Sequence, residues 1–177
     1  MGFFDHHSAQ EYYRKDELMA ETIHRMEQFQ EYHCLRSPAP ANAVRPAFLR
    51  DAPEQYLKWL SHCDGGLLFD TVLLSIREYD PELDLEFDQL AQENTDENHG
   101  KFGLPPAFYI IGYRSYGDPI CVREKDLHIY LWDCEAQAFD TIWGTFHDFL
   151  SDEVDTAIEL IADGSLEPIP LKLAGDC

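Results

Sequence analysis

Residues 53–66, PEQYLKWLSHCDGG, combine a helix start, an apolar stripe and a helix stop in one short stretch. Proline fits the first turn of a helix, because that position needs no backbone N–H donor. The apolar residues recur at helical spacing and form one stripe, namely Tyr56, Leu57, Trp59, Leu60 and Cys63. Glycine readily adopts the left-handed conformation that ends a helix. The stretch therefore predicts a helix that begins at Pro53 and is stopped by Asp64-Gly65-Gly66.

A longer helix is predicted upstream, from Ser8 to Leu35. It opens with the capping-box pattern S-x-x-E at Ser8 and Glu11. One apolar stripe recurs along it, formed by Tyr12, Met19, Ile23 and Met26. The prolines that follow predict an extended linker over residues 36–50. The pattern leaves open whether this helix is a separable arm, a lid on the domain or a pairing surface for a second copy.

Downstream of the two glycines, the sequence predicts a series of strands that ends in a helix. The expected strands cover residues 67–76, 107–113, 120–124, 127–133 and 139–143. A helix is favoured from about Leu83 to Asn94, followed by a polar loop to Gly103. Thr145 and Asp148 are expected to cap the last helix reciprocally, and Gly164 to stop it. Residues 165–177 contain two prolines and are expected to form a loose tail.

The composition excludes several classes of function. The 177 residues include 34 Asp and Glu but only 13 Lys and Arg, a formal net charge of −21. A chain with this balance lacks the cations that nucleic-acid binding or polybasic docking on a membrane requires. With 45% hydrophobic and 13% aromatic residues it has enough apolar material for one folded domain.

The sequence also carries expectations about compartment and thiols. It has neither a visible secretory signal nor an apolar run long enough to span a membrane, which predicts a cytoplasmic protein. The number of cysteines is odd and C-x-x-C is absent, so we expect free thiols rather than a disulfide framework. The five are Cys34, Cys63, Cys121, Cys134 and Cys177.

Five segments in this order resemble the landmarks of the SUKH superfamily, a group named partly for the fungal cell-wall-synthesis and killer-toxin-resistance regulators. The first is residues 53–66, and the others are Phe108-Tyr109-Ile110-Ile111-Gly112, Tyr116-Gly117-Asp118-Pro119-Ile120, Ile129-Tyr130-Leu131-Trp132-Asp133-Cys134-Glu135 and Thr145-Phe146-His147-Asp148-Phe149-Leu150. The resemblance covers roughly residues 46–163. Two departures are Ala52, where leucine is usual, and Thr145, which replaces the serine of S-F-x-x-F-L and keeps a capping hydroxyl.

The resemblance implies a fold and a class of function. The fold is α+β, a single domain with a mixed, mostly antiparallel sheet and helices packed on it, here preceded by a long N-terminal helix. The expected parts are an N-terminal helix and linker (1–45), the SUKH-like domain (46–164) and a tail (165–177). Bacterial members resemble immunity proteins that bind a cognate toxin, frequently a nuclease, and others are scaffold-like regulators. Neither branch is an enzyme.

Candidate catalytic patterns are weak. Residues 112–117 spell G-x-x-S-x-G, one residue longer than the nucleophile elbow of hydrolases, and a turn between two strands explains both glycines. The eight histidines have no partners at metal-binding spacing. We therefore predict no catalytic residue, no metal and no cofactor.

The acidic residues are concentrated in two segments. Residues 78–100 hold nine acids and residues 126–171 hold eleven, and neither segment contains Lys or Arg. A solvated surface would explain this pattern, but so would a docking surface for a cationic toxin cleft. The favoured hypothesis is an immunity protein that binds a basic nuclease toxin, and the alternative is an intracellular scaffold with a non-toxin partner. The predicted partner-binding residues are Asp80, Glu82, Asp84, Glu86 and Asp88, with Glu93, Asp96 and Glu97 as a second group.

Overall fold

The computed structural model describes residues 6–77 and 89–169, with side chains from residue 17 onward. Seven strands form one antiparallel sheet in which each strand pairs with the next along the chain, so that the sheet is a simple meander. The strands are β1 (His33–Leu35), β2 (Gly66–Leu68), β3 (Thr71–Leu73), β4 (Phe108–Arg114), β5 (Pro119–Arg123), β6 (Ile129–Asp133) and β7 (Ala138–Trp143). Within the described residues, the parallel pairing is an isolated bridge between Ser75 and Gln89. The predicted α+β class is confirmed.

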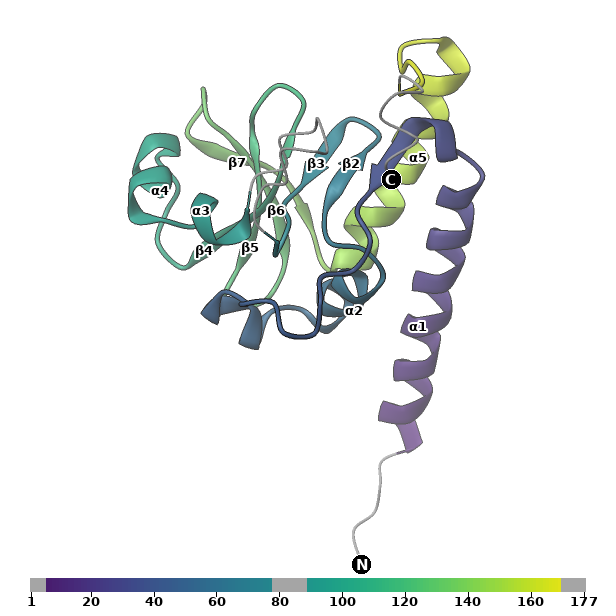
Figure 1. Ribbon diagram of the computed structural model, residues 1–177, viewed down its shortest axis with the longest axis horizontal. Coiled ribbons are helices and arrows are strands. Elements are labelled where there is room, and N and C mark those ends of the chain that lie inside the picture. Colours follow the sequence, from purple (N-terminus) through teal and green to yellow (C-terminus); the bar gives the residue numbers. More distant parts are fainter. Residues whose placement is uncertain (1–5, 78–88, 170–177) are drawn as a thin grey trace, which may run out of the picture.

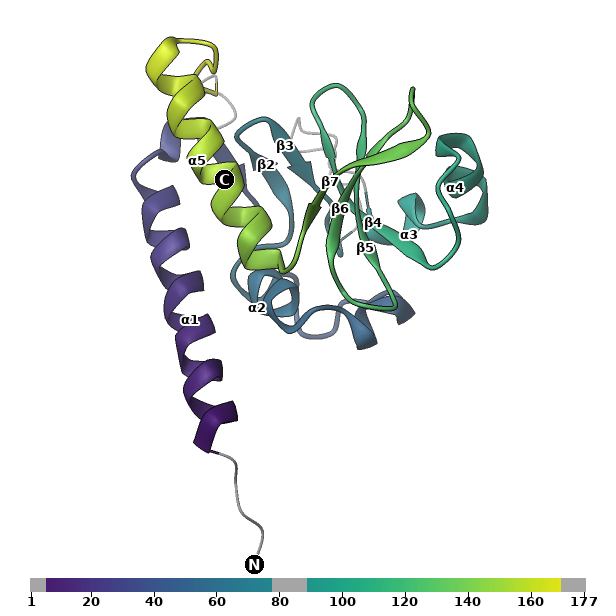
Figure 2. The ribbon, with the colours of Figure 1, turned by 180° about the vertical axis from the view of Figure 1, so that it is seen from behind.

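Helices lie at both ends of this sheet. They are α1 (His6–Glu27), α2 (Glu54–His62), α3 (Leu90–Glu93), α4 (Asp96–Phe102) and α5 (Phe146–Asp163), with short 3-10 helices η1 (Gln30–Tyr32) and η2 (Ala47–Asp51). Figures 1 and 2 show α1 and α5 side by side at one end, with α3 and α4 at the other. Tyr56 and Trp59 of α2 pack on Phe146 of α5, with ring centroids 5.1 and 6.1 Å apart. This aromatic cluster joins α2 to α5, and the contact between Trp143 of β7 and Phe149 joins α5 to the sheet.

The N-terminal helix is shorter than predicted and covers the domain. It ends at Glu27, and the predicted helix end at Leu35 is wrong because residues 33–35 pair with β2 as an edge strand. Met19 and Met26 of the predicted stripe are buried in the core. Thr22 lies 3.1 Å from the His147 imidazole of α5 through Oγ1 and Nε2. The described part of α1 is therefore a lid on its own domain, and pairing with a second copy stays a prediction.

Two further expectations are corrected by backbone geometry. The single strand over 67–76 is a tight hairpin of β2 and β3, with Phe69 in the left-handed region at its turn. The polar loop over 94–103 is largely the helix α4, which Thr95 caps by accepting a hydrogen bond from the Asn98 N–H at 3.3 Å. The sequence also predicts a helix from about Leu83 to Asn94. Its second half is α3, and residues 83–88 lie outside the described residues.

The double glycine has a different role from the predicted one. Helix α2 does begin after Pro53, but it ends at His62 and Cys63 is already extended. Gly66 has a φ of +129°, and a Cβ there would lie 2.3 Å from the Cys34 carbonyl oxygen. Gly66 therefore permits β1 to approach β2 closely, and neither glycine is the residue at which the helix ends.

The structure also tests the prediction of free thiols and shows whether any described helix could span a membrane. Cys63, Cys121 and Cys134 are free, as predicted, whereas Cys34 is disulfide-bonded and contradicts the prediction. Burial raises the pKa of the Cys63 and Cys121 thiols well above their ordinary range, as expected for inert core residues. Across the described ranges, no helix has both the length and the apolar character that a membrane crossing needs.

The cap of α5 gives a first testable expectation. Thr145 accepts a hydrogen bond from the Asp148 N–H at 3.1 Å, which satisfies one of the free donors at the start of the helix. We expect Thr145→Ala to lower the free energy of unfolding by ~1 kcal/mol, measured by urea denaturation. Thr145→Ser retains the hydroxyl and is the matched control. An equal loss in both variants would contradict a capping role.

Candidate partner-binding surface

The predicted acidic ladder itself, Asp80, Glu82, Asp84, Glu86 and Asp88, lies outside the described residues. The residues on either side of it are held by a buried polar network. Asp64 is fully buried and accepts hydrogen bonds from the Ile76 N–H at 2.6 Å and from the Arg77 Nε at 3.0 Å. On the other side, Gln89 donates from its side chain to the Ile76 carbonyl at 3.1 Å. The residues on the two sides of the acidic segment 78–88 are therefore bonded to each other and to Asp64.

A buried arginine completes this network. Arg36 is 6% exposed and donates to the Ser75 hydroxyl at 2.7 Å, while Ser75 donates to Asp64 at 3.3 Å. The Leu90 N–H donates to the Ser75 carbonyl at 2.8 Å. Burying a charge is costly unless it is paired, and Asp64 meets this condition through its ion pair with Arg77. We call Arg36, Asp64, Ser75, Arg77 and Gln89 the anchor network.

The second group of predicted residues divides into two kinds. Glu93 is half-buried and accepts hydrogen bonds from the Tyr113 hydroxyl and from the Asn98 side chain, so it holds α3 and α4 to the sheet. Asp96 and Glu97 are exposed in the first turn of α4, where carboxylates favour the helix dipole. Of these three, only Asp96 and Glu97 present a carboxylate to solvent.

Several arginines form ion pairs within the chain, and each of these pairs also uses one acid. Arg77 pairs with Asp64, and Arg114 pairs with Glu153. Arg123 donates to Asp126 and lowers the pKa of that carboxyl below its usual range, helped by the His128 N–H. Among the arginines whose side chains the structure describes, hydrogen bonds within the chain are donated by Arg25, Arg36, Arg77, Arg114 and Arg123.

The exposed acids of the second segment lie mostly along α5, with Asp140 on β7 and Glu135 in the turn before it. Glu153 is the buried exception, at 3% exposed. The exposed ones are Glu135, Asp140, Asp148, Asp152, Asp155, Glu159, Asp163 and Glu167. A charged face of this kind attracts a cationic partner over distances of about a Debye length, ~8–10 Å at physiological salt.

Glu153 and Arg114 form an ion pair between α5 and β4. Arg114 Nη1 lies 2.6 Å from Glu153 Oε1, and both side chains are largely buried. Thr71 donates its hydroxyl to the same carboxylate. Burial raises the pKa of Glu153, while Arg114 and Thr71 act in the opposite direction. Burial at the contact between α5 and β4 therefore accounts for the raised pKa of Glu153, and the ion pair with Arg114 gives this carboxylate a structural role.

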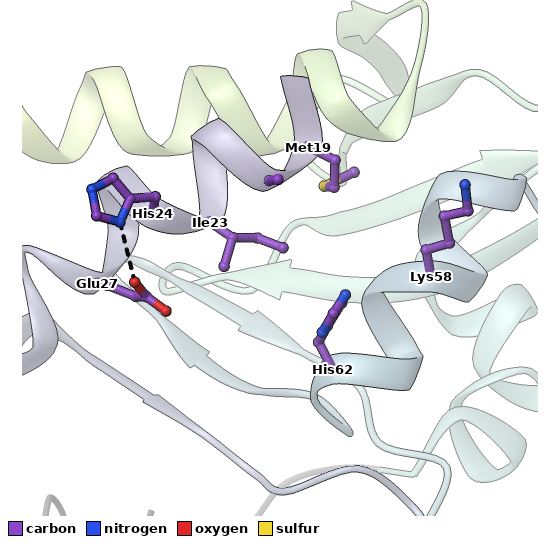
Figure 3. A pocket seen from close by; sticks show the side chains of 7 residues that line it. Met19, Ile23, His24, Glu27, Lys58 and His62 are labelled. Carbon is purple, nitrogen blue, oxygen red and sulfur yellow. Dashed lines mark hydrogen bonds and ion pairs between the residues drawn. The ribbon is translucent and has the colours of Figure 1, made fainter. Parts of the chain in front are cut away.

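Two cavities have mixed linings. One of about 320 Å³ lies between α1 and α2, and Figure 3 shows Met19 and Ile23 on one side with Lys58 and His62 on the other. The second, of about 260 Å³, lies at the N-termini of α2 and α5, where Glu54 and Asp126 would repel an anion. Neither combines groups that select one ligand.

The catalytic patterns receive structural explanations. Ser115 is exposed in the turn between β4 and β5, and its N–H donates to the Asp70 carbonyl at 3.0 Å. Gly117 belongs to the turn as predicted, but Gly112 lies inside β4, where a Cβ would be 2.6 Å from the Val72 carbonyl oxygen. In the described part of the chain, no group of three or more His, Cys, Asp or Glu side chains could hold a metal ion.

The sequence reasoning missed one acidic cavity of about 330 Å³, lined by Phe48, Asp51, Tyr109 and Glu124. Asp51 and Glu124 are isolated acids beside Arg50 and Lys125, so a search for long acidic runs passes over them. Only the fold brings η2 next to the residue that follows β5. The SUKH-like strand at Phe108–Gly112 marked the position of Tyr109 but not its neighbours.

Comparison with known proteins places the domain. No curated protein matches the sequence. The sequence profile of the SMI1 / KNR4 family (SUKH-1) matches residues 48–152, which run from η2 into α5 and contain α2, the anchor network apart from Arg36, and strands β2 to β7. The match covers more than half of the chain, so the protein belongs to the SMI1 / KNR4 family (SUKH-1).

Proposed function

We propose that this protein is a non-enzymatic immunity protein, which binds a basic toxin domain, a nuclease, and neutralises it by occupying its cationic cleft. Family membership supports a protein-binding role. The observation that carries the proposal is the distribution of charge, because 20 of the 34 acids fall in two segments without Lys or Arg. A nuclease presents cations to phosphate, and a surface of carboxylates competes for them without offering a bond to cleave.

The acidic segment 78–88, with Asp96 and Glu97 beyond it, is the proposed contact. The residues that flank it, Arg77 and Gln89, are held by the anchor network, so a partner that binds there meets a segment whose neighbours on both sides are fixed. Tethering reduces the conformational entropy that is lost on binding. The same surface would serve an intracellular scaffold with a non-toxin partner, which is the alternative that the test below separates.

The test is a binding measurement against the product of the gene next to this one. We expect the triple variant D80K/D84K/D88K to weaken binding by about 10- to 100-fold and to flatten its dependence on salt. The matched control E17K/E21K/E31K changes the net charge equally at exposed positions of α1 and η1. We expect this control to change the affinity about twofold or less at physiological salt.

Each outcome separates the hypotheses. Equal weakening in both triple variants would mean that total charge, rather than the 78–88 segment, drives association. A neighbouring product that has no toxin features and still binds would favour the scaffold. A toxin that is bound with unchanged affinity by D80K/D84K/D88K would sink the proposed contact.

A further inference from the structure

The cavity at η2 differs from the two cavities with mixed linings, because its lining consists of two acids and two aromatic residues. Asp51 ends η2 and Glu124 directly follows β5, and both carboxylates are exposed. Phe48 and Tyr109 form an aromatic wall, with ring centroids 4.6 Å apart and an interplanar angle of 26°. Glu124 is fixed beside β4 because its N–H donates to the Ala107 carbonyl at 2.9 Å. The cavity therefore offers two negative charges over a stacked aromatic pair.

A second observation points to a missing partner. The Tyr109 side chain is 3% exposed, and its hydroxyl has no hydrogen-bond partner among the described residues. Burial, together with Glu124 and Asp51, raises the pKa of this phenol well above its usual range, so the hydroxyl is neutral. A buried polar group without a partner is unfavourable, and it commonly marks a position that a ligand completes. A neutral hydroxyl beside two carboxylates suits a ligand that carries several donors and a positive charge.

We propose that this cavity receives one arginine side chain of a protein partner. A guanidinium is planar, stacks on aromatic rings and donates in several directions at once, so it can serve both carboxylates and the phenol. At about 330 Å³ the cavity is at the small end of ligand sites, which suits a single side chain better than a larger molecule. A lysine ammonium is a compact charge that lacks the planar stacking surface.

This inference rests on the proposed function for the source of the arginine, since a basic toxin supplies such side chains. It adds a site that the acidic segment 78–88 does not include. The segment would attract the partner through long-range charge, whereas the cavity would fix one side chain and with it the orientation of the complex.

The first experiment needs no toxin. The full chain is titrated with N-acetyl-arginine amide and followed by NMR. We expect saturable shifts at Phe48 and Tyr109 that are at least tenfold smaller in D51N/E124Q and unchanged in the matched control D96N/E97Q. N-acetyl-lysine amide is expected to bind at least threefold more weakly. Shifts spread evenly over the acidic surface, or shifts that persist in D51N/E124Q, would overturn the proposal.

A second variant tests the hydroxyl. Y109F keeps the aromatic wall and removes only the unpartnered oxygen, so we expect its melting temperature to be equal or higher and its affinity for N-acetyl-arginine amide to fall about threefold. A lower melting temperature would mean that the hydroxyl is satisfied within the protein, which contradicts the proposal.

The two proposals fail separately. If the arginine probe binds as expected but no toxin is found, the cavity stands and the immunity role falls. If the toxin binds the wild type and D51N/E124Q equally well, the immunity role stands and the cavity falls. We expect D51N/E124Q to weaken toxin binding at least tenfold.

Discussion

Arg114→Met is expected to lower the free energy of unfolding by ~3–5 kcal/mol, because it leaves the Glu153 carboxylate buried without its cation. Glu153 is 3% exposed, and Arg114 Nη1 lies 2.6 and 2.8 Å from its two carboxylate oxygens. The pair joins α5 to β4, so its loss acts on the whole domain. Urea denaturation measures the effect, with Arg45→Met, at an exposed arginine, as the matched control.

The same variant has a defined pH dependence. Burial raises the folded-state pKa of Glu153 above its unfolded value, and Arg114 counteracts part of this rise. A carboxyl with a raised folded pKa contributes stability that is lost as the pH rises from the unfolded to the folded pKa. Removing Arg114 raises this pKa further, so we expect the R114M penalty to be larger at about pH 7 than at about pH 5.

A double variant separates the pair from its surroundings. R114M/E153L replaces both charges with apolar groups, and we expect it to be more stable than R114M alone, since no buried charge remains unpaired. A penalty for R114M no larger than that for R45M, or one that grows on acidification, would contradict this account of the pair.

The part of the fold that the sequence predicts best is the part in which local signals agree. Strands β4 to β7 have apolar patterns bounded by turn residues, and α5 starts at a capping threonine and ends at Gly164 with a φ of +77°. In these elements local preference and tertiary packing favour the same conformation, so a single sequence is enough to predict them.

The errors arise where packing overrides a local pattern or where short signals are hidden among polar residues. Residues 33–35 fall within the helix predicted from Ser8 to Leu35, yet their backbone pairs with β2, and Gly66 makes this approach possible. Helix α4 has no buried residues, so apolar periodicity could not reveal it. Its cap residues, Thr95 and Gly103, are the signals in the sequence that mark its two ends.

For the candidate site, prediction from the sequence is limited in a different way. Acid density in the sequence locates a charged region, but it cannot tell an exposed carboxylate from one that is used inside the fold. Glu93 bonds Tyr113, and Glu153 pairs with Arg114, whereas Asp96 and Glu97 face solvent. The Asp51 and Glu124 cavity depends on how η2 packs against β4, and a sequence pattern does not encode that contact.

Asp64→Ala is expected to lower the free energy of unfolding by ~3–5 kcal/mol, because it removes a buried acceptor from several donors at once and leaves Arg77 without its carboxylate. Asp64 is fully buried and accepts from the Ile76 and Arg77 N–H groups at 2.6 and 3.1 Å. Asp64→Asn keeps one oxygen acceptor and should lose less. Asp140→Ala, at an exposed acid, is the matched control for urea denaturation.

The same variants connect the family motif to the proposed binding surface. Asp64 belongs to the D-G-G landmark, and through Arg77 it holds one described end of the segment 78–88, while Ser75 and Gln89 hold the other. We therefore expect hydrogen exchange in D64N to accelerate first at residues 75–77 and 89–90, at denaturant concentrations where the core is still protected. Loss of protection at the same rate throughout the domain would show that Asp64 supports the core alone. Selective loss, joined to weaker binding of the basic partner, would show that this landmark aspartate positions the acidic segment.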